Sequence, residues 1–142
     1  SRPRDGGGDA HAILVEGGRK GAVRPASGAP GTRVEMRDLF YAVPARRKFL
    51  RQPRAEADRA VEAVRRLALA WPAVGFRVVV DGREALSLQP ATRDGRVHDL
   101  LGPEFAAAAL PVSAEAPGGL SLSGLAAQPA HTRPTGAAQH LV

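Results

Sequence analysis

A run of basic side chains between Arg46 and Arg66 is the part of the sequence whose residue types could do chemistry. It holds eight basic residues against three acidic ones, a local surplus of five. Such a surplus can neutralise phosphates and release their counterions, which drives sequence-independent DNA binding that weakens with salt. The alternative is a solvated helix face with ordinary ion pairs, such as Glu62 with Arg65 or Arg66. The basic residues are Arg46, Arg47, Lys48, Arg51, Arg54, Arg59, Arg65 and Arg66.

The other candidate residues are few. Gly31 and Thr32 open an extended stretch, and taken alone they are explained by a turn and by β-propensity. Arg133, near His131, could touch DNA from a loop, although a lone loop arginine is more often solvated. The chain has no cysteine, its four histidines show no metal-ligand spacing, and no Ser, His and Asp are placed to suggest a nucleophile. We therefore expect no metal held by protein ligands and nominate no catalytic residue.

Composition sets wider bounds on the chain. Its 142 residues suffice for one domain or for parts of two. The net charge is +6, and all but two of the 20 basic residues are arginine, the side chain that best suits phosphate recognition. Richness in Ala, Gly, Pro and Arg is equally typical of GC-rich coding. No apolar run approaches the ~18 residues that a membrane span needs, so we expect a soluble protein.

The segment before the basic run predicts a small antiparallel sheet. Ala12–Glu16 and Gly21–Pro25 have the pattern of two strands, with a hairpin turn at Gly17–Lys20. Thr32–Asp38 alternates apolar and polar residues, which predicts a third strand with one buried face. Leu39–Tyr41 then form a bulky corner that we expect to be buried. Three strands with one apolar face need a covering layer, which a helix downstream can provide.

Two helices follow this sheet. Pro44 suits the first turn of a helix, and good helix formers come after it. A longer helix runs from about Arg54 to Ala70 and ends there because Pro72 disfavours helix at the residue before it. Its apolar stripe should lie on the sheet, and Trp71-Pro72 marks the best domain boundary, with residues 1–72 before it and 73–142 after. The stripe consists of Ala57, Ala60, Val61, Val64, Leu67, Ala68 and Trp71.

The remainder of the chain predicts further strands and short helices, which gives a mixed α/β (α+β) fold class. Asp81-Gly82 supplies the two central residues of a type I′ turn, so the strands on either side form a hairpin. The predicted elements are strands at Gly75–Asp81 and Arg83–Leu88, helices at Arg93–Leu101 and Glu104–Ala108, strands at Leu110–Ala116 and Leu120–Ala127, and a last strand that starts at Gln139.

The stretch from Gly31 to Leu50, GTRVEMRDLFYAVPARRKFL, resembles the MutL family of DNA mismatch repair proteins. That family carries a Gly-Thr, an LF.N.PAR.KFL block and a long helix in this order. One departure is Ala42, which stands where many members have Asn. The agreement continues along nearly the whole chain, at Glu56, Arg65–Ala70, Asp81–Arg83, Leu101–Gly102 and His131–Arg133.

The resemblance implies a central fragment of the N-terminal region of such a protein. Residues 1–72 would be the C-terminal half of a GHKL ATPase α/β sandwich, and residues 73–142 most of a ribosomal protein S5 domain 2-like transducer domain. In the family, the threonine that matches Thr32 helps to hold the adenine of ATP, and Gly31 would let the backbone come close. The glutamate that activates water, the asparagine that holds Mg²⁺ and the lid motif would all precede Ser1. We therefore expect an ATPase as the parent protein and an inactive chain on its own.

The function that the resemblance implies is DNA mismatch repair by an ATP-dependent molecular switch. The implied partners are double-stranded or mismatched DNA, a mismatch-recognition protein and a downstream nuclease or helicase, with a homodimer in the full-length protein and a cytoplasmic, nucleoid-associated location. Arg46 is alternatively expected to brace the join between the domains. The residues expected to contact DNA are Arg46, Arg47, Lys48, Arg51 and Arg133.

Three alternatives stay open. A type II topoisomerase B-like protein also joins a GHKL ATPase to an S5-like transducer domain, although the PAR.KFL block argues against it. A stand-alone nucleic-acid-binding module without ATPase activity would use the same arginine surplus. A fragment with no independent function is the third. DNA binding by the isolated, cooperatively folded chain would favour the second of these.

Overall fold

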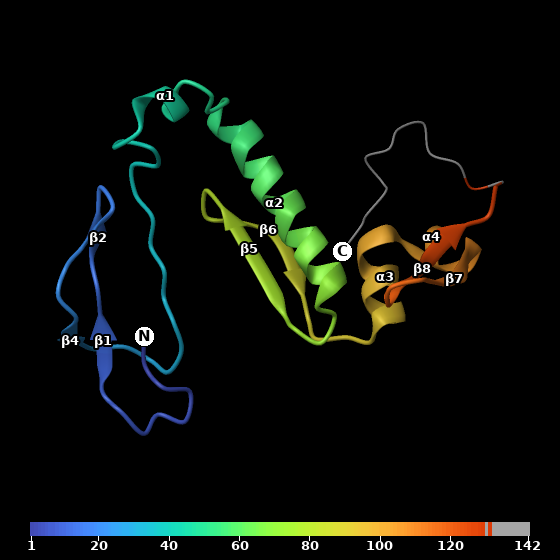
Figure 1. The fold of residues 1–142 in the computed structure, drawn as a ribbon, viewed down its shortest axis with the longest axis horizontal. Helices are drawn as coiled ribbons and strands as arrows, with labels where there is room; N and C mark the ends of the chain where they lie inside the picture. Colours follow the sequence, from blue (N-terminus) through green and yellow to red (C-terminus); the bar gives the residue numbers. More distant parts are fainter. Residues whose placement is uncertain (130, 132–142) are drawn as a thin grey trace. The chain divides into compact units, whose positions relative to one another are not determined.

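The computed structural model of the chain describes residues 1–129 and residue 131. The chain divides into two compact units, Ser1–Arg51 and Gln52–Val142. Helices and strands are mixed, which confirms the predicted α/β class (Figure 1). The strands of the described residues form four separate two-stranded antiparallel sheets, β1–β4, β2–β3, β5–β6 and β7–β8.

The first unit is built on a long hairpin. Its closing turn is Gly17-Gly18, where φ angles of 56° and 83° give the left-handed conformation that a type I′ turn requires. The predicted hairpin is confirmed, but its turn is shorter than the predicted Gly17–Lys20, since Arg19 and Lys20 belong to a strand, and each arm is split into two short strands. In pairing order these are β1 (Ala10–Ala12) with β4 (Arg24–Ala26), and β2 (Val15–Glu16) with β3 (Arg19–Lys20).

The predicted third strand, Thr32–Asp38, is wrong. The segment is extended but unpaired, and only Gly31 forms an isolated bridge, with Arg2. Val34 and Met36, which we expected to be buried, are 84% and 73% exposed. Alternation of apolar and polar residues indicates a face suited to burial, but a strand also needs a neighbour for its backbone hydrogen bonds. Among the described residues no strand forms a backbone hydrogen-bond ladder with this segment.

A turn connects this segment to α1 (Pro44–Arg47), whose start at Pro44 confirms the predicted helix. Asp38 and Phe40 have positive φ angles of 48° and 64°, and the Tyr41 backbone N–H donates to the Asp38 carbonyl at 2.9 Å. The predicted burial of the corner is wrong for Leu39 and Tyr41, which are 45% and 50% exposed. These two side chains are covered only in part, and the Tyr41 hydroxyl lies beside Gly17 of the hairpin turn.

The second unit begins with α2 (Pro53–Ala70), which confirms the predicted long helix. Figure 1 shows this helix lying along the β5–β6 hairpin, and it also packs against α3. The side that faces the core is centred on Ala68, which is 0% exposed, whereas Leu67 and Trp71 are 53% and 63% exposed. Ala60 is exposed as well, so the predicted stripe is too wide in its middle and at its C-terminal end. Coverage of the first unit's strands by α2 stays a prediction.

The hairpin of β5 (Phe76–Val80) and β6 (Arg83–Leu88) is confirmed together with its turn. Asp81 and Gly82 have φ angles of 49° and 76°, the left-handed values of a type I′ turn. Phe76, Val78 and Val80 share one half-buried face, as predicted. The hairpin therefore offers an apolar side to α2.

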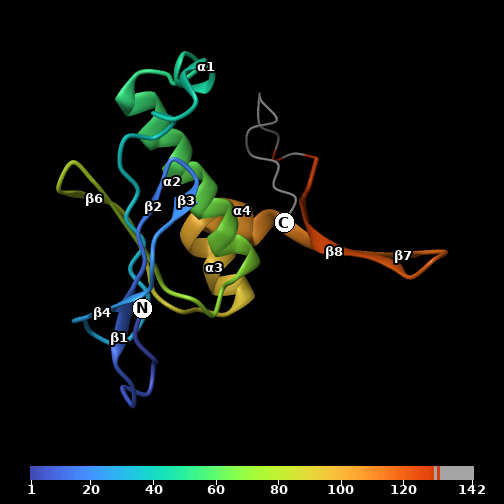
Figure 2. The same cartoon turned by 60° about the vertical axis from the view of Figure 1, so that its left-hand side comes forward.

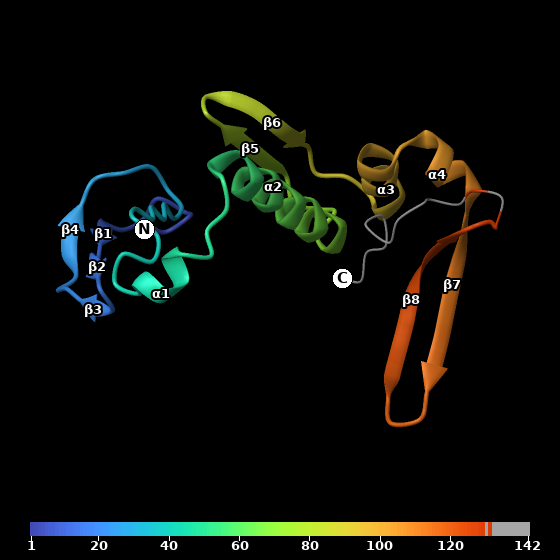
Figure 3. The same ribbon diagram turned by 90° about the horizontal axis from the view of Figure 1, so that it is seen from above.

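Two short helices and a second hairpin complete the unit. In α3 (Arg93–Leu101), the Thr92 hydroxyl accepts from the Gly95 N–H at 3.2 Å and caps the first turn. Gly102, at φ 90°, ends α3 and leads into α4 (Pro103–Ala108). Figures 2 and 3 show β7 (Ala109–Ala116) and β8 (Leu120–Ala127) forming a hairpin that extends beyond these helices. The last strand, predicted from Gln139, lies outside the described residues.

The core of the second unit crosses the predicted domain boundary at Trp71-Pro72. Ala68 of α2, Leu88 of β6 and Leu100 of α3 form one buried cluster. The compact units divide after Arg51 instead. Domains at residues 1–72 and 73–142 therefore stay a prediction.

Candidate functional site

The basic residues of the first unit lie on and after α1. Arg46 and Arg47 occupy the last turn of this helix, where a positive side chain is favoured by the helix dipole. Lys48 and Arg51 follow, and all four side chains are exposed. No carboxylate among the described residues lies within ion-pair distance of Arg46, Arg47 or Lys48. These three cations are therefore available to a phosphate from outside the chain.

The basic residues of α2 differ among themselves. Glu62 forms the ion pairs that helical spacing predicts, with Arg65 at 3.8 Å and with Arg66 at 3.7 Å. Arg65 Nη2 also donates to the Leu100 carbonyl at 2.8 Å, so this arginine is held within the unit. Arg54 and Arg59 are exposed and have no charged partner among the described residues. The arginine surplus therefore divides into side chains that hold the fold and side chains that face outward.

Gly31 and Thr32 are adjacent at the start of the extended segment. Gly31 has φ 119°, which a residue with a side chain rarely adopts, and no heavy atom lies within 4 Å of where a Cβ would stand. Its backbone exchanges hydrogen bonds of 2.8 and 3.0 Å with Arg2. The Thr32 hydroxyl is exposed and lies 3.0 Å from the Ser1 hydroxyl. A ligand could approach this backbone closely, and the hydroxyl can donate or accept a hydrogen bond.

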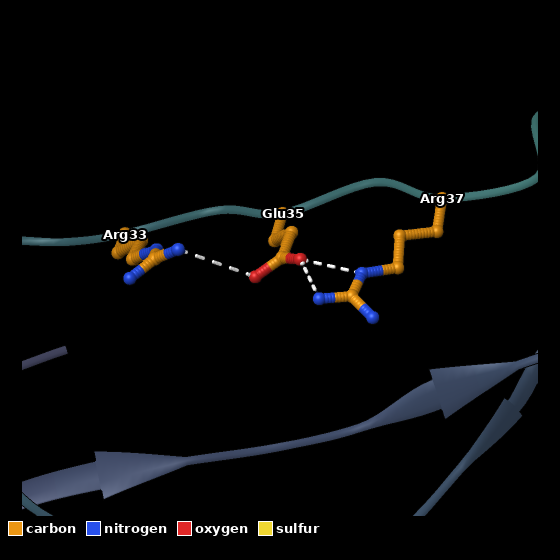
Figure 4. Close-up of polar contacts among 3 residues, drawn as sticks. All are labelled: Arg33, Glu35 and Arg37. Atoms are coloured by element: carbon orange, nitrogen blue, oxygen red, sulfur yellow. Dashed lines mark hydrogen bonds and ion pairs between the residues drawn. The ribbon is translucent and has the colours of Figure 1, made fainter.

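Beyond Thr32, three charged side chains share one side of the extended segment (Figure 4). Glu35 lies between Arg33 and Arg37, with a bond of 3.4 Å from Arg33 Nη2 and one of 2.5 Å from Arg37 Nε. The side chains of Arg33 and Arg37 are 88% and 80% exposed. Ion pairs this exposed contribute little to stability. The cluster leaves one net positive charge beside Thr32.

Arg96 in α3, which no sequence pattern singled out, is 0% exposed. Its Nη2 atom donates to three backbone carbonyls of the loops around the β5–β6 hairpin. The available signal was its position in the helix, because Arg96 lies four residues before Leu100 on the same helix face, and Leu100 is buried. A charged residue on the apolar face of a short helix needs a partner, and here the backbone supplies it.

Two expectations concern features that the described part of the chain does not show. No group of three or more His, Asp or Glu side chains that could hold a metal ion occurs among residues 1–129 and 131. Within the same residues, no helix combines the length and apolar character of a membrane span. Arg133, a predicted DNA contact, lies outside the described residues.

Comparisons with known proteins match nearly the whole chain, although no family model matches it. The chain is 48% identical over 142 residues to the DNA mismatch repair protein MutL of Rhodospirillum rubrum, covering 96% of this chain and 22% of that protein. It is 45% identical to the MutL of Nitrobacter winogradskyi, covering 93% of this chain and 23% of that protein. The chain thus spans between a fifth and a quarter of the length of these curated relatives.

A solved structure matches as well. It is the Aquifex aeolicus MutL ATPase domain complexed with ADP, which is 33% identical with a TM-score of 0.60. The match covers 72% of this chain and 41% of that one. Together the two comparisons confirm the resemblance drawn from the Gly31–Leu50 block, and they confirm the fold class.

Proposed function

We propose that this chain, which is a MutL-type segment by its sequence and its fold, serves DNA mismatch repair as part of an ATP-driven switch of the GHKL type. The observation that supports this most is identity of 43% to 48% with MutL proteins over almost the whole chain. A charge surplus or a Gly-Thr pair would not carry the proposal alone, because each has a structural explanation.

Within the switch, Gly31 and Thr32 would contact the adenine of the nucleotide. The exposed Thr32 hydroxyl and the open space at Gly31 fit this role. ATP would supply the differential binding energy that shifts the parent protein between its conformations. We propose that the ligand for Mg²⁺ and the group that activates water lie outside this chain, so the parent hydrolyses ATP and the chain alone does not.

The DNA surface of the switch would include the exposed cations of the first unit. Arg46, Arg47 and Lys48 are free of carboxylates within the described chain, which leaves their charge for phosphates. Contacts of this kind do not read bases, so they would bind double-stranded or mismatched DNA alike. Arg51 and Arg133 are proposed as further contacts.

The rest of the chain would transmit the state of the switch. We propose that residues 73–142 belong to an S5 domain 2-like transducer domain, and that the parent works as a homodimer with a mismatch-recognition protein and a downstream nuclease or helicase. A nucleoid-associated location would follow from DNA binding.

A chimera tests the proposal. The matched segment of Rhodospirillum rubrum MutL is exchanged for this chain, and the spontaneous mutation rate is measured in cells that carry only the chimera. We expect a rate close to that of the unaltered protein. A rate as high as that of a MutL deletion, with chimera present at a normal level, would contradict the proposal. As a control for the effect of a single surface change, the chimera with Arg83→Gln, at an exposed position, should give the same mutation rate as the chimera itself.

A further inference from the structure

Arg96 is a cation buried among backbone carbonyls. Its side chain is fully buried in α3, and Nη2 donates to the carbonyls of Pro72 and Val74, each at 2.8 Å, and of Gln89 at 2.9 Å. The guanidinium carbon also lies 5.9 Å from the centre of the Phe76 ring, within the range of a cation–π interaction. One nitrogen atom thus serves three acceptors.

The three carbonyls come from the two chain segments that flank the β5–β6 hairpin, one before β5 and one after β6. Pro72 and Val74 belong to the loop between α2 and β5, and Gln89 follows β6. The same two segments are joined directly, because the Ala91 N–H donates to the Pro72 carbonyl at 2.9 Å. Arg96 therefore fastens α3 to the base of the hairpin and to the C-terminal end of α2.

A contribution to stability alone does not explain why a charged side chain occupies this buried position. No carboxylate among the described residues pairs with it, and its Nε and Nη1 atoms are buried without a hydrogen-bond partner. Burying a cation in this way is costly, and an apolar side chain of similar size often serves stability as well. The guanidinium is planar, so the directions of its hydrogen bonds are fixed. Loops whose carbonyls accept these bonds are therefore restricted in their arrangement.

A second arginine joins two of these elements, α2 and α3. Arg65 of α2 donates from Nη2 to the carbonyl of Leu100, at the end of α3, at 2.8 Å. The apolar cluster of Ala68, Leu88 and Leu100 also joins α2, β6 and α3. The contacts between α2, the hairpin and α3 therefore combine hydrogen bonds from two arginines with an apolar cluster.

We propose that Arg96 is a positioning residue that pins α2, the β5–β6 hairpin and α3 into one rigid body, with Arg65 as a second link. A displacement of α2 is then carried to α3 as a whole instead of being absorbed at Trp71-Pro72. The use of this pin to transmit a nucleotide signal rests on the proposed function, whereas the rigidity itself does not.

The test measures how widely the distance between α2 and α3 varies. Because the chain contains no cysteine, spin labels can be placed on Ala63→Cys and Asp99→Cys, two exposed positions, in the full 142-residue chain. Electron–electron double resonance then gives the distribution of label distances. We expect a narrow distribution in the labelled parent chain and one about twofold broader with Arg96→Met, because the loops lose their common partner.

Two variants separate pinning from the general effect of a substitution. Arg96→Lys retains a charge and three donors on one nitrogen, so it should keep most of the narrow distribution. Arg83→Met, at an exposed site on β6, should leave it unchanged. If Arg96→Met unfolds the chain, Arg65→Met takes its place, since Arg65 is partly exposed and its loss should broaden the distribution with the fold intact.

Two results would overturn the proposal. One is a folded Arg96→Met chain with a distribution as narrow as that of the parent. The other, if Arg96→Met does not fold, is an unchanged distribution with Arg65→Met. If the chimera fails in mismatch repair while the labelled parent chain has a narrow distance distribution that Arg96→Met broadens, that combination would contradict the proposed function but not the positioning role of Arg96.

Discussion

The first unit, Ser1–Arg51, exposes its large aliphatic side chains, whereas the second, Gln52–Val142, buries several of its own. Among the described residues of the first unit, Ala10 alone is a buried apolar residue. Arg2 helps to hold this unit by donating to the carbonyls of Gly6 and Gly8, each at 3.0 Å. The first unit therefore depends on backbone hydrogen bonds. The buried apolar residues of the second are Ala68, Leu88, Val97 and Leu100.

The difference shows where each unit can take part in function. A surface with exposed apolar side chains and exposed cations is suited to contact with another protein chain, a nucleic acid or a small ligand. A packed core with a buried arginine is suited to keeping helices in fixed positions. In the proposed switch, the first unit would meet nucleotide and DNA, and the second would carry the response.

The largest expected effect comes from truncating a leucine in the second unit. Leu100 is 7% exposed, so Leu100→Ala should lower the free energy of unfolding of this unit by about 2–5 kcal/mol. The same truncation in the first unit, Leu14→Ala, removes a side chain that is 59% exposed and should cost less than about 1 kcal/mol. Urea unfolding followed by circular dichroism measures both. Equal losses of unfolding free energy in the two variants would contradict the difference in packing between the units.

A smaller effect is expected at the start of α3. Thr92→Ala removes the oxygen that accepts from the Gly95 N–H and should destabilise the second unit by about 1 kcal/mol. Thr92→Ser keeps an oxygen at this position and should recover most of the loss. If both variants unfold at the same urea concentration, the cap does not contribute to stability.

The nucleotide role of Thr32 predicts an effect of similar size in a different measurement. In the chimera, Thr32→Val should weaken binding of a non-hydrolysable ATP analogue by about fivefold, because one hydrogen bond contributes about 1 kcal/mol. Ser27→Ala, at another exposed hydroxyl of the first unit, should leave the affinity unchanged. Equal affinities for Thr32→Val and the unaltered chimera would rule out this contact.

The smallest effect is expected at Met36, which is 73% exposed on the unpaired segment. Met36→Gln should change the unfolding free energy of the isolated chain by no more than about 0.5 kcal/mol. A loss of more than about 2 kcal/mol would show that this side chain is buried in solution. That result would restore the strand predicted at Thr32–Asp38.

Local sequence signals predicted the second unit better than the first. Pro72 and Asp81-Gly82 each fix a backbone geometry through their own chemistry, and the elements next to them were confirmed. The segment after Gly31 has only an alternating pattern, and a strand depends on a partner that such a pattern does not supply.

For the candidate site, the exposure and the ion pairing of the basic side chains could be predicted from the sequence, but the partners of Arg96 could not. Exposure of Arg46, Arg47 and Lys48 followed from charge on a short helix, and the pairing of Glu62 followed from its spacing. The role of Arg96 did not follow, because its partners are backbone carbonyls. Carbonyls carry no side-chain identity, so the sequence gives no sign of which ones will converge.

DNA binding by the chimera with Rhodospirillum rubrum MutL tests the central functional claim most directly. Affinity for a short duplex is measured at several salt concentrations, with Arg46, Arg47 and Lys48 changed to Gln together. The matched control changes Arg19, Lys20 and Arg24 to Gln, which removes the same charges from exposed positions of the same unit. We expect the slope of log affinity against log salt to fall by about 0.9 for each lost phosphate contact in the first variant and to stay unchanged in the control. Equal slopes in the two variants would contradict the proposed DNA surface.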